Sequence, residues 1–197
     1  DGGCTWTPNG VQTPAGFKAA YETYWKAGWL SLPLAPEYGG QGFPFSYGKP
    51  LEEMLCTANM SFCLYVGLTQ SAFESIEEIG TETQRHMYLP KMGSGEWTGT
   101  MCLTEPQAGT DLGAVRTKAI PQADGSFKLV GSKIFITGGD HDLADNTIHY
   151  VLARIEGAPA GVPLGQGDGG EQAGHHRRRA PHHAGRLSAG RRLRVRP

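Results

Sequence analysis

Residues 101–111, MCLTEPQAGTD, begin the part of the chain in which the chemistry-bearing residues are concentrated. From Trp97 onward, apolar and hydroxyl-bearing residues alternate, which predicts a strand that runs into this stretch. The loop that follows carries Pro106, Gly109 and other small residues, an arrangement that lets a backbone lie close to a flat polar ligand. An ordinary tight loop capped by Asp111 fits the same residues.

The part before this stretch has the pattern of helices. Aromatic and apolar residues at three- to four-residue spacing predict a helix that ends at Gly28. Its start is predicted at Thr13 and Pro14, with the threonine hydroxyl as N-cap. Residues 30–50 contain four prolines and are predicted to form an ordered loop.

Two or three more helices are predicted after this loop. One begins near Pro50 and breaks before another, over residues 64–79. Thr81 and Gln84 have the spacing of a capping box, which predicts a short helix ending near Pro90.

The pattern changes from a helical period to a period of two after residue 95. The predicted strands span residues 97–104, 115–120, 127–130, 133–137 and 148–153. Asp124 and Gly125 mark a hairpin turn between two of them. Helices therefore precede antiparallel strands, which predicts an α+β fold and argues against a βαβ nucleotide-binding fold.

Charge is distributed unevenly along the 197 residues. The formal net charge is only −1, but residues 1–162 carry −7 and residues 163–197 carry +6. All 18 aromatic residues lie in the first segment, and eight arginines lie in the second. Such an asymmetry fits either an acidic domain with a basic nucleic-acid tail or a tail that is not part of the same fold.

Several protein classes do not fit this composition. No run of 18 apolar residues is present, so no membrane span is expected. The four cysteines lack disulfide or zinc spacing, and we expect reduced thiols, a cytoplasmic protein and no metal site. Those cysteines are Cys4, Cys56, Cys63 and Cys102.

Residues 102–114, CLTEPQAGTDLGA, resemble the signature of the acyl-CoA dehydrogenase family at every specified position. Residues 79–84, IGTETQ, and 88–96, YLPKMGSGE, resemble the family's approach to that motif. Residues 131–137, GSKIFIT, resemble its second flavin motif, usually G-x-K-x-W-I-T, and APEYGG at 35–40 resembles a loop of its helical domain.

This resemblance covers about residues 17–162, and GGDHDL at 138–143 is similar to a longer bacterial branch that includes 3-methylmercaptopropionyl-CoA dehydrogenases. It implies an incomplete N-terminal helical domain over 1–95 and part of an antiparallel β-barrel middle domain over 96–162. Residues 163–197, rich in arginine and glycine, are expected to be disordered.

The resemblance implies an FAD site, and Thr110 sits where the family has a hydroxyl near both the cofactor and the thioester substrate. Thr104 matches the residue that hydrogen-bonds the isoalloxazine ring, and Thr137 matches the hydroxyl facing flavin N5. Phe135 replaces the tryptophan beside the flavin, which changes the packing without abolishing it. The implied FAD-binding residues are Met101, Cys102, Leu103, Thr104, Thr110, Phe135, Ile136 and Thr137.

The implied reaction is the α,β-dehydrogenation of an acyl-CoA thioester to the 2-enoyl-CoA, with an electron-transferring flavoprotein as acceptor. The family's base is usually a glutamate of a C-terminal helical domain, so no catalytic residue is assigned here. Glu105 is expected to be a structural hydrogen-bond partner. The full-length family member is expected to be a homo-oligomer, and this chain alone to bind FAD weakly or not at all, without turnover.

The basic tail leaves an alternative open. The chain could instead be a non-catalytic fragment, or a polypeptide whose tail binds nucleic acid or other anions, although the tail has no aromatic residue for stacking. A shifted reading frame in a GC-rich gene would also produce a segment of this composition. Translation of the neighbouring frame tests that hypothesis, because a frameshift predicts an apolar strand there.

Overall fold

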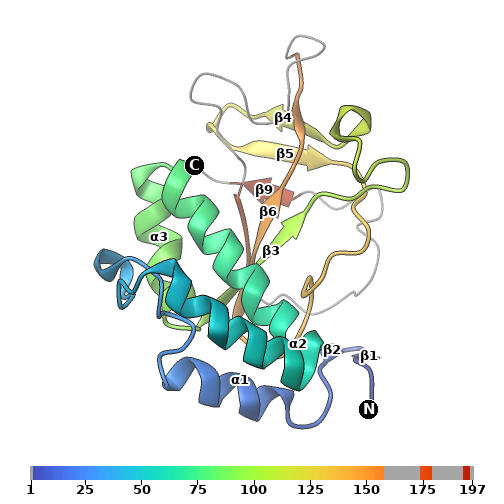
Figure 1. The fold of residues 1–197 in the computed structure, drawn as a ribbon. Helices are drawn as coiled ribbons and strands as arrows, with labels where there is room; N and C mark the ends of the chain where they lie inside the picture. The colour runs from blue at the N-terminus through green and yellow to red at the C-terminus, as the bar shows by residue number, and fades with distance from the viewer. Residues whose placement is uncertain (1, 158–173, 179–192, 196–197) are drawn as a thin grey trace. The chain divides into compact units, whose positions relative to one another are not determined.

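The computed structural model describes residues 2–157, 174–178 and 193–195 (Figure 1). The contacts within the chain define two compact units. The first contains residues 2–100 and 137–148, and the second contains residues 101–136 and 149–157. Helices precede the larger sheets along the chain, which confirms the predicted α+β class.

The first unit is mainly helical. It begins with a short antiparallel hairpin that the sequence patterns did not predict, β1 (Thr5–Thr7) and β2 (Gly10–Gln12). The helices that follow are α1 (Phe17–Lys26), the 3₁₀ helix η1 (Pro36–Tyr38), α2 (Phe45–Ile79) and α3 (Glu82–Gly93). None of the helices in the described part of the chain is long and apolar enough to cross a membrane.

Helix α1 begins later than predicted. The residue before it is Gly16, in a left-handed conformation with φ of 91°, and not Thr13. The hydroxyl and the backbone N–H of Thr13 instead donate to Oδ1 of Asp142, at 2.7 and 3.0 Å. The prediction of Thr13 as N-cap was therefore wrong, because a partner distant in sequence takes its hydroxyl.

The second helix has a break, as predicted, but it lies at Asn59 and not just before residue 64. Asn59 has φ of −161° and ψ of 100°, and its Oδ1 accepts a hydrogen bond of 3.0 Å from the backbone N–H of Phe62. The asparagine thus caps the second half of α2. The start of α2 was predicted too late, since the helix begins at Phe45 and Pro50 lies inside it.

Helix α3 has the predicted capping box. The backbone N–H of Gln84 donates to Oγ1 of Thr81, and the backbone N–H of Thr81 donates to Oε1 of Gln84 at 2.9 Å. Each partner satisfies a donor at the start of the helix that has no acceptor within it. The helix continues past Pro90 to Gly93.

The core of the first unit consists of two apolar clusters. The larger joins α2 and α3 to β3 and β6 through Phe73, Leu89, Met92, Trp97 and Ile148 among others. The smaller contains Tyr21, Leu30, Phe62, Val66 and Leu143. Burial of each large side chain contributes roughly 1.5–3 kcal/mol, so these clusters fix the helices and the segment 137–148 together.

The strands form two larger sheets. They are β3 (Trp97–Cys102), β4 (Lys118–Pro121), β5 (Phe127–Val130), β6 (Asn146–Val151), β7 (Arg154–Ile155), β8 (Gly174–Arg178) and β9 (Leu193–Val195). Their orders are β3-β6-β8 and β7-β4-β5-β9. The predicted hairpin at Asp124 and Gly125 is confirmed, because β4 and β5 pair antiparallel across it. The pairing of β7 with β4 departs from the antiparallel pattern, because these two strands run parallel.

Two predicted strands differ from the structure. Residues 133–137 form a loop, because Phe135 has φ of 58°, which no extended strand can contain. The strand predicted over 115–120 begins only at Lys118. The backbone N–H groups of Arg116 and Thr117 donate to Glu105 and are therefore not available for a strand partner.

The structure describes all four cysteines but only a small part of the tail. Cys4, Cys56, Cys63 and Cys102 form no disulfide bond within the described part of the chain, and their reduced state stays a prediction. The predicted disordered tail, 163–197, falls mostly outside the described residues, and the described strands β8 and β9 lie within it. The disorder, the reading-frame hypothesis and the domain boundaries at 95 and 162 stay predictions.

Candidate functional site

The predicted site residues lie at the end of β3 and in two loops. Cys102 is buried with 3% exposure, whereas Met101 beside it is 37% exposed. Leu103 and Thr104 are half-buried and follow the strand, and Thr110 is exposed farther along the same loop.

The second loop carries the other three predicted residues. Ile136 is half-buried, whereas Phe135 is 87% exposed. Thr137 is exposed and belongs to the first unit, so the structure does not place it with the rest.

The structure brings the two loops of the second unit together at residues 103–105 and 133–134. The backbone N–H of Ile134 donates to the carbonyl oxygen of Thr104 at 2.9 Å. Nζ of Lys133 donates to the carbonyl oxygen of Leu103, also at 2.9 Å. The two stretches that resemble the family's flavin motifs are thus in contact at these residues within one unit.

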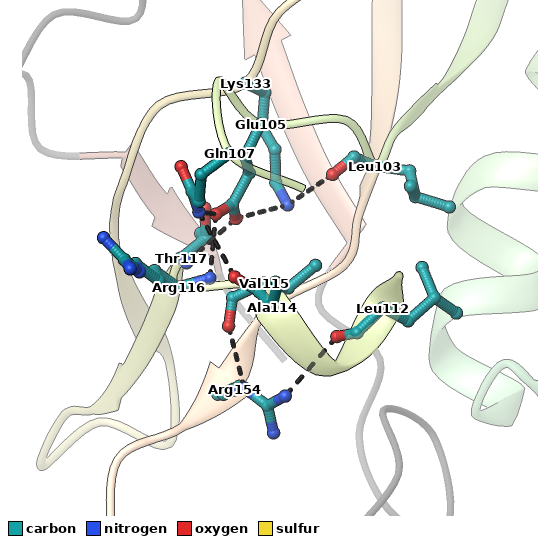
Figure 2. A network of polar contacts seen from close by, with 10 residues as sticks. All are labelled: Leu103, Glu105, Gln107, Leu112, Ala114, Val115, Arg116, Thr117, Lys133 and Arg154. Carbon is teal, nitrogen blue, oxygen red and sulfur yellow. Dashed lines mark hydrogen bonds and ion pairs between the residues drawn. The ribbon is translucent and has the colours of Figure 1, made fainter. Parts of the chain in front are cut away.

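A buried ion pair joins the two loops. Nζ of Lys133 lies 2.9 Å from Oε1 of Glu105, and the two side chains are only 2% and 3% exposed. Glu105 also accepts hydrogen bonds from the backbone N–H groups of Arg116, at 2.8 Å, and Thr117, at 2.9 Å. We call this set, with the Gln107 side chain that also contacts the carboxylate, the Glu105 network (Figure 2).

The Glu105 carboxylate is held in its charged form. Burial alone would raise its pKa, but hydrogen bonds from Thr117, Lys133 and the backbone N–H of Arg116 lower it to about 2, from an ordinary value of 4.5. The carboxylate accepts four hydrogen bonds, and the ammonium has a second acceptor in the carbonyl oxygen of Leu103. Additional hydrogen bonds of this kind offset the cost of burying two charges. Glu105 therefore acts as a structural hydrogen-bond partner, as predicted from the sequence.

Phe135 differs from the rest of the loop in conformation. It is the one non-glycine residue with positive φ in the described part of the chain, at 58°. A left-handed conformation costs a residue with a Cβ atom roughly 1–2 kcal/mol. The backbone of Phe135 is therefore strained, although the ring it carries is 87% exposed and gains little from packing.

The sequence patterns did not identify Arg154, the first residue of β7. Its guanidinium donates to the carbonyl oxygens of Val115 at 2.8 Å, Gly113 at 2.7 Å and Leu112 at 3.4 Å. These carbonyls follow Thr110 in the first loop, some 40 residues away in sequence. No local signal predicts such a contact, because it depends on the pairing of β7 with β4.

These residues can bind a ligand that has an apolar face and polar edges. An exposed aromatic ring at Phe135 and hydroxyl groups at Thr104 and Thr110 lie on loops whose backbones are fixed from within. The described residues contain no group of three or more metal-ligating side chains.

Comparison with known proteins identifies two successive domains. Residues 6–96 match the family description "Acyl-CoA dehydrogenase, N-terminal domain". Residues 100–184 match "Acyl-CoA dehydrogenase, middle domain". The second match includes the whole Glu105 network and extends beyond residue 162.

Curated relatives agree with these matches. The 3-methylmercaptopropionyl-CoA dehydrogenase of Ruegeria pomeroyi is 47% identical over 152 residues, which cover 77% of this chain and 26% of that protein. A broad-specificity linear acyl-CoA dehydrogenase of Mycobacterium tuberculosis is 40% identical over 153 residues, covering 77% of this chain and 25% of that protein. The chain thus spans about a quarter of the length of these relatives.

Solved structures show the same fold. Butyryl-CoA dehydrogenase from Megasphaera elsdenii matches with a TM-score of 0.60 and 30% identity, over 68% of this chain and 36% of that one. An acyl-CoA dehydrogenase from Bacillus anthracis, complexed with FAD, matches with a TM-score of 0.63 and 26% identity, over 82% of this chain and 26% of that one. With both domain matches on consecutive parts of the sequence, the chain belongs to the acyl-CoA dehydrogenase family.

Proposed function

We propose that residues 101–104, 110, 135 and 136 bind FAD and that this chain is part of an enzyme that converts an acyl-CoA thioester to the 2-enoyl-CoA. The family membership supports the reaction class, and a relative of the same fold was solved with FAD bound. The observation that carries the proposal is Phe135, an exposed ring in a strained conformation, on a loop tied to the first flavin motif by a buried ion pair.

The proposal gives each site residue a separate task. Phe135 would pack its ring against the isoalloxazine, while the hydroxyl of Thr104 would hydrogen-bond a polar edge of it. Thr110 would lie near both cofactor and thioester, whereas Thr137, which the resemblance also implies, belongs to the first unit and is given no task here. The backbone and apolar side chains around the flavin would come from Met101, Cys102, Leu103 and Ile136. Bound FAD would supply the acceptor for the hydride that leaves the β-carbon of the substrate.

The reaction needs a base that removes the α-proton of the substrate, and none of the described residues is assigned that role. A general base must bind a proton reversibly near the working pH. Glu105 has a pKa of about 2 and is engaged with Lys133 and two backbone N–H groups, so it is unsuited to that role. We propose that the base is supplied from outside the described residues.

The proposed substrate is an acyl-CoA thioester as a class. The named relatives act on different acyl groups, a methylmercaptopropionyl group in one and linear acyl groups in another. The proposed electron acceptor is an electron-transferring flavoprotein, and the proposed assembly of the full-length enzyme is a homo-oligomer.

Titration of the 197-residue chain with FAD tests the cofactor proposal. We expect weak but saturable quenching of flavin fluorescence as the ring packs against Phe135, without acyl-CoA-dependent bleaching of the bound flavin. FMN and riboflavin serve as controls for non-specific binding of the ring. Non-saturable quenching that is identical for unrelated proteins would contradict the proposal, and bleaching by an acyl-CoA would show that the chain already contains a base.

A further inference from the structure

The turn after Thr110 has backbone carbonyls that need donors. The 3₁₀ helix η2 (Leu112–Ala114) is a single turn, so few of its carbonyl oxygens have partners within it. At its start, Oδ1 of Asp111 accepts from the backbone N–H of Gly113 at 2.8 Å, and the backbone N–H of Leu112 donates to the carbonyl oxygen of Thr110 at 3.1 Å. The backbone of Thr110 is thus part of this turn.

Arg154 donates to three of these carbonyl oxygens, of which that of Leu112 also accepts from the backbone N–H of Val115 at 3.2 Å. Its Nε donates to Val115 and its Nη2 donates to Leu112 and Gly113, as Figure 2 shows for the two residues drawn, Val115 and Leu112. Nε2 of Gln107 donates to the carbonyl oxygen of Ala114 at 3.3 Å. Four successive carbonyl groups are therefore satisfied by side chains, three of them by one guanidinium.

The backbone of Arg154 is fixed to the same segment. Its N–H donates to the carbonyl oxygen of Thr117 at 2.8 Å, in the parallel pairing that places Arg154 beside Lys118. The N–H of Thr117 in turn donates to Glu105. Arg154 therefore spans the segment from Leu112 to Thr117, and the Glu105 network holds the far end of that segment.

We propose that Arg154 is a positioning residue for the FAD site: by holding the turn after Thr110 it fixes the loop that carries the threonine. The proposal rests on the proposed function, because the ligand concerned is FAD. A guanidinium is required, since its planar fork reaches three carbonyl oxygens at once, whereas a lysine ammonium is a single flexible point of charge. Preorganisation of the loop reduces the entropy lost when a ligand orders it.

Three substitutions in the 197-residue chain test this role. Arg154→Met keeps the aliphatic stem and removes the donors, and Arg154→Lys keeps the charge without the fork. Arg116→Met is the matched control, because it removes the same charge from an exposed side chain whose backbone N–H stays on Glu105. Hydrogen exchange of residues 110–117 is measured without flavin, and FAD affinity and the visible circular dichroism of bound FAD are measured in parallel.

We expect Arg154→Met to accelerate exchange over residues 110–117, to weaken FAD binding roughly tenfold and to change the dichroism of the bound flavin. Arg154→Lys should recover part of each effect, and Arg116→Met should match the wild type. Unchanged exchange and unchanged affinity in Arg154→Met would overturn the inference. If Arg154→Met does not fold, the same comparison is made with Arg154→Lys.

The two arms separate this inference from the proposed function. A wild-type chain that does not bind FAD would contradict the flavin proposal and, with it, the role of Arg154 at a flavin site, whatever the exchange data show. A wild-type chain that binds FAD, with accelerated exchange but unchanged affinity and dichroism in Arg154→Met, would retain the flavin site and overturn the positioning role alone.

Discussion

Lys133 and Phe135 lie two residues apart in one loop, yet their environments are opposite. The ammonium of Lys133 is buried against Glu105 and the carbonyl of Leu103, and its side chain is only 2% exposed. The ring of Phe135 is 87% exposed and its backbone is strained. Lys133, on the inner side of the loop, stabilises the fold through its buried ion pair. Phe135, on the outer side, gains no stability from burial, as expected for a residue that contacts a ligand.

The largest predicted effect comes from removing the buried ion pair between Lys133 and Glu105. Lys133→Met leaves the Glu105 carboxylate buried without its cation, which should lower the free energy of unfolding by about 3–5 kcal/mol. Lys118→Met is the control, because Lys118 forms an exposed ion pair of 3.4 Å with Glu156, the residue after the neighbouring strand β7. That pair is worth at most about 1 kcal/mol. Equal losses in the two variants, measured by urea denaturation, would contradict the comparison.

The next effect depends on pH. Because the folded-state pKa of Glu105 is about 2, below its ordinary value of 4.5, its stabilising contribution is complete above about pH 4.5 and is lost as the pH falls toward 2. The stability difference between the wild type and Glu105→Gln should therefore shrink over this interval. A difference that stays constant from pH 6 to pH 3, measured by denaturant unfolding, would show that the carboxylate charge is not responsible.

The smallest predicted effect concerns the outer residue and has the opposite sign. Phe135→Gly should raise the free energy of unfolding by about 0.5–1 kcal/mol, because glycine adopts a φ of 58° without the strain of a Cβ atom, partly offset by its greater freedom when unfolded. Phe135→Ala, which loses the ring but keeps the Cβ atom, should show no such gain. Thermal unfolding of the two variants measures the difference.

Features set by neighbouring residues could be predicted from the sequence. The capping box of Thr81 and Gln84, the turn at Asp124 and the break in α2 all depend on interactions within three or four residues. The failures have distant causes. Asp142 takes the hydroxyl of Thr13, and Glu105 takes two backbone donors, which shortens the strand predicted from residue 115.

In the candidate site too, features set by nearby residues could be predicted and those set by distant residues could not. The two motifs around Thr104 and Phe135 could be placed from the sequence, and the structure brings their loops together. The resemblance alone suggested that Glu105 is structural, but its partner Lys133 was not identified. Arg154 could not be found from the sequence, because its position beside residues 112–117 depends on the parallel pairing of β7 with β4.

The most direct test of the account is the FAD affinity of Phe135→Gly, measured on the same samples as its stability. The account predicts opposite changes: a more stable chain that binds FAD roughly tenfold more weakly, because the contact of the ring with the flavin is lost while the strain is relieved. An equal or higher FAD affinity in a more stable Phe135→Gly chain would contradict the claim that this strained, exposed ring serves the cofactor.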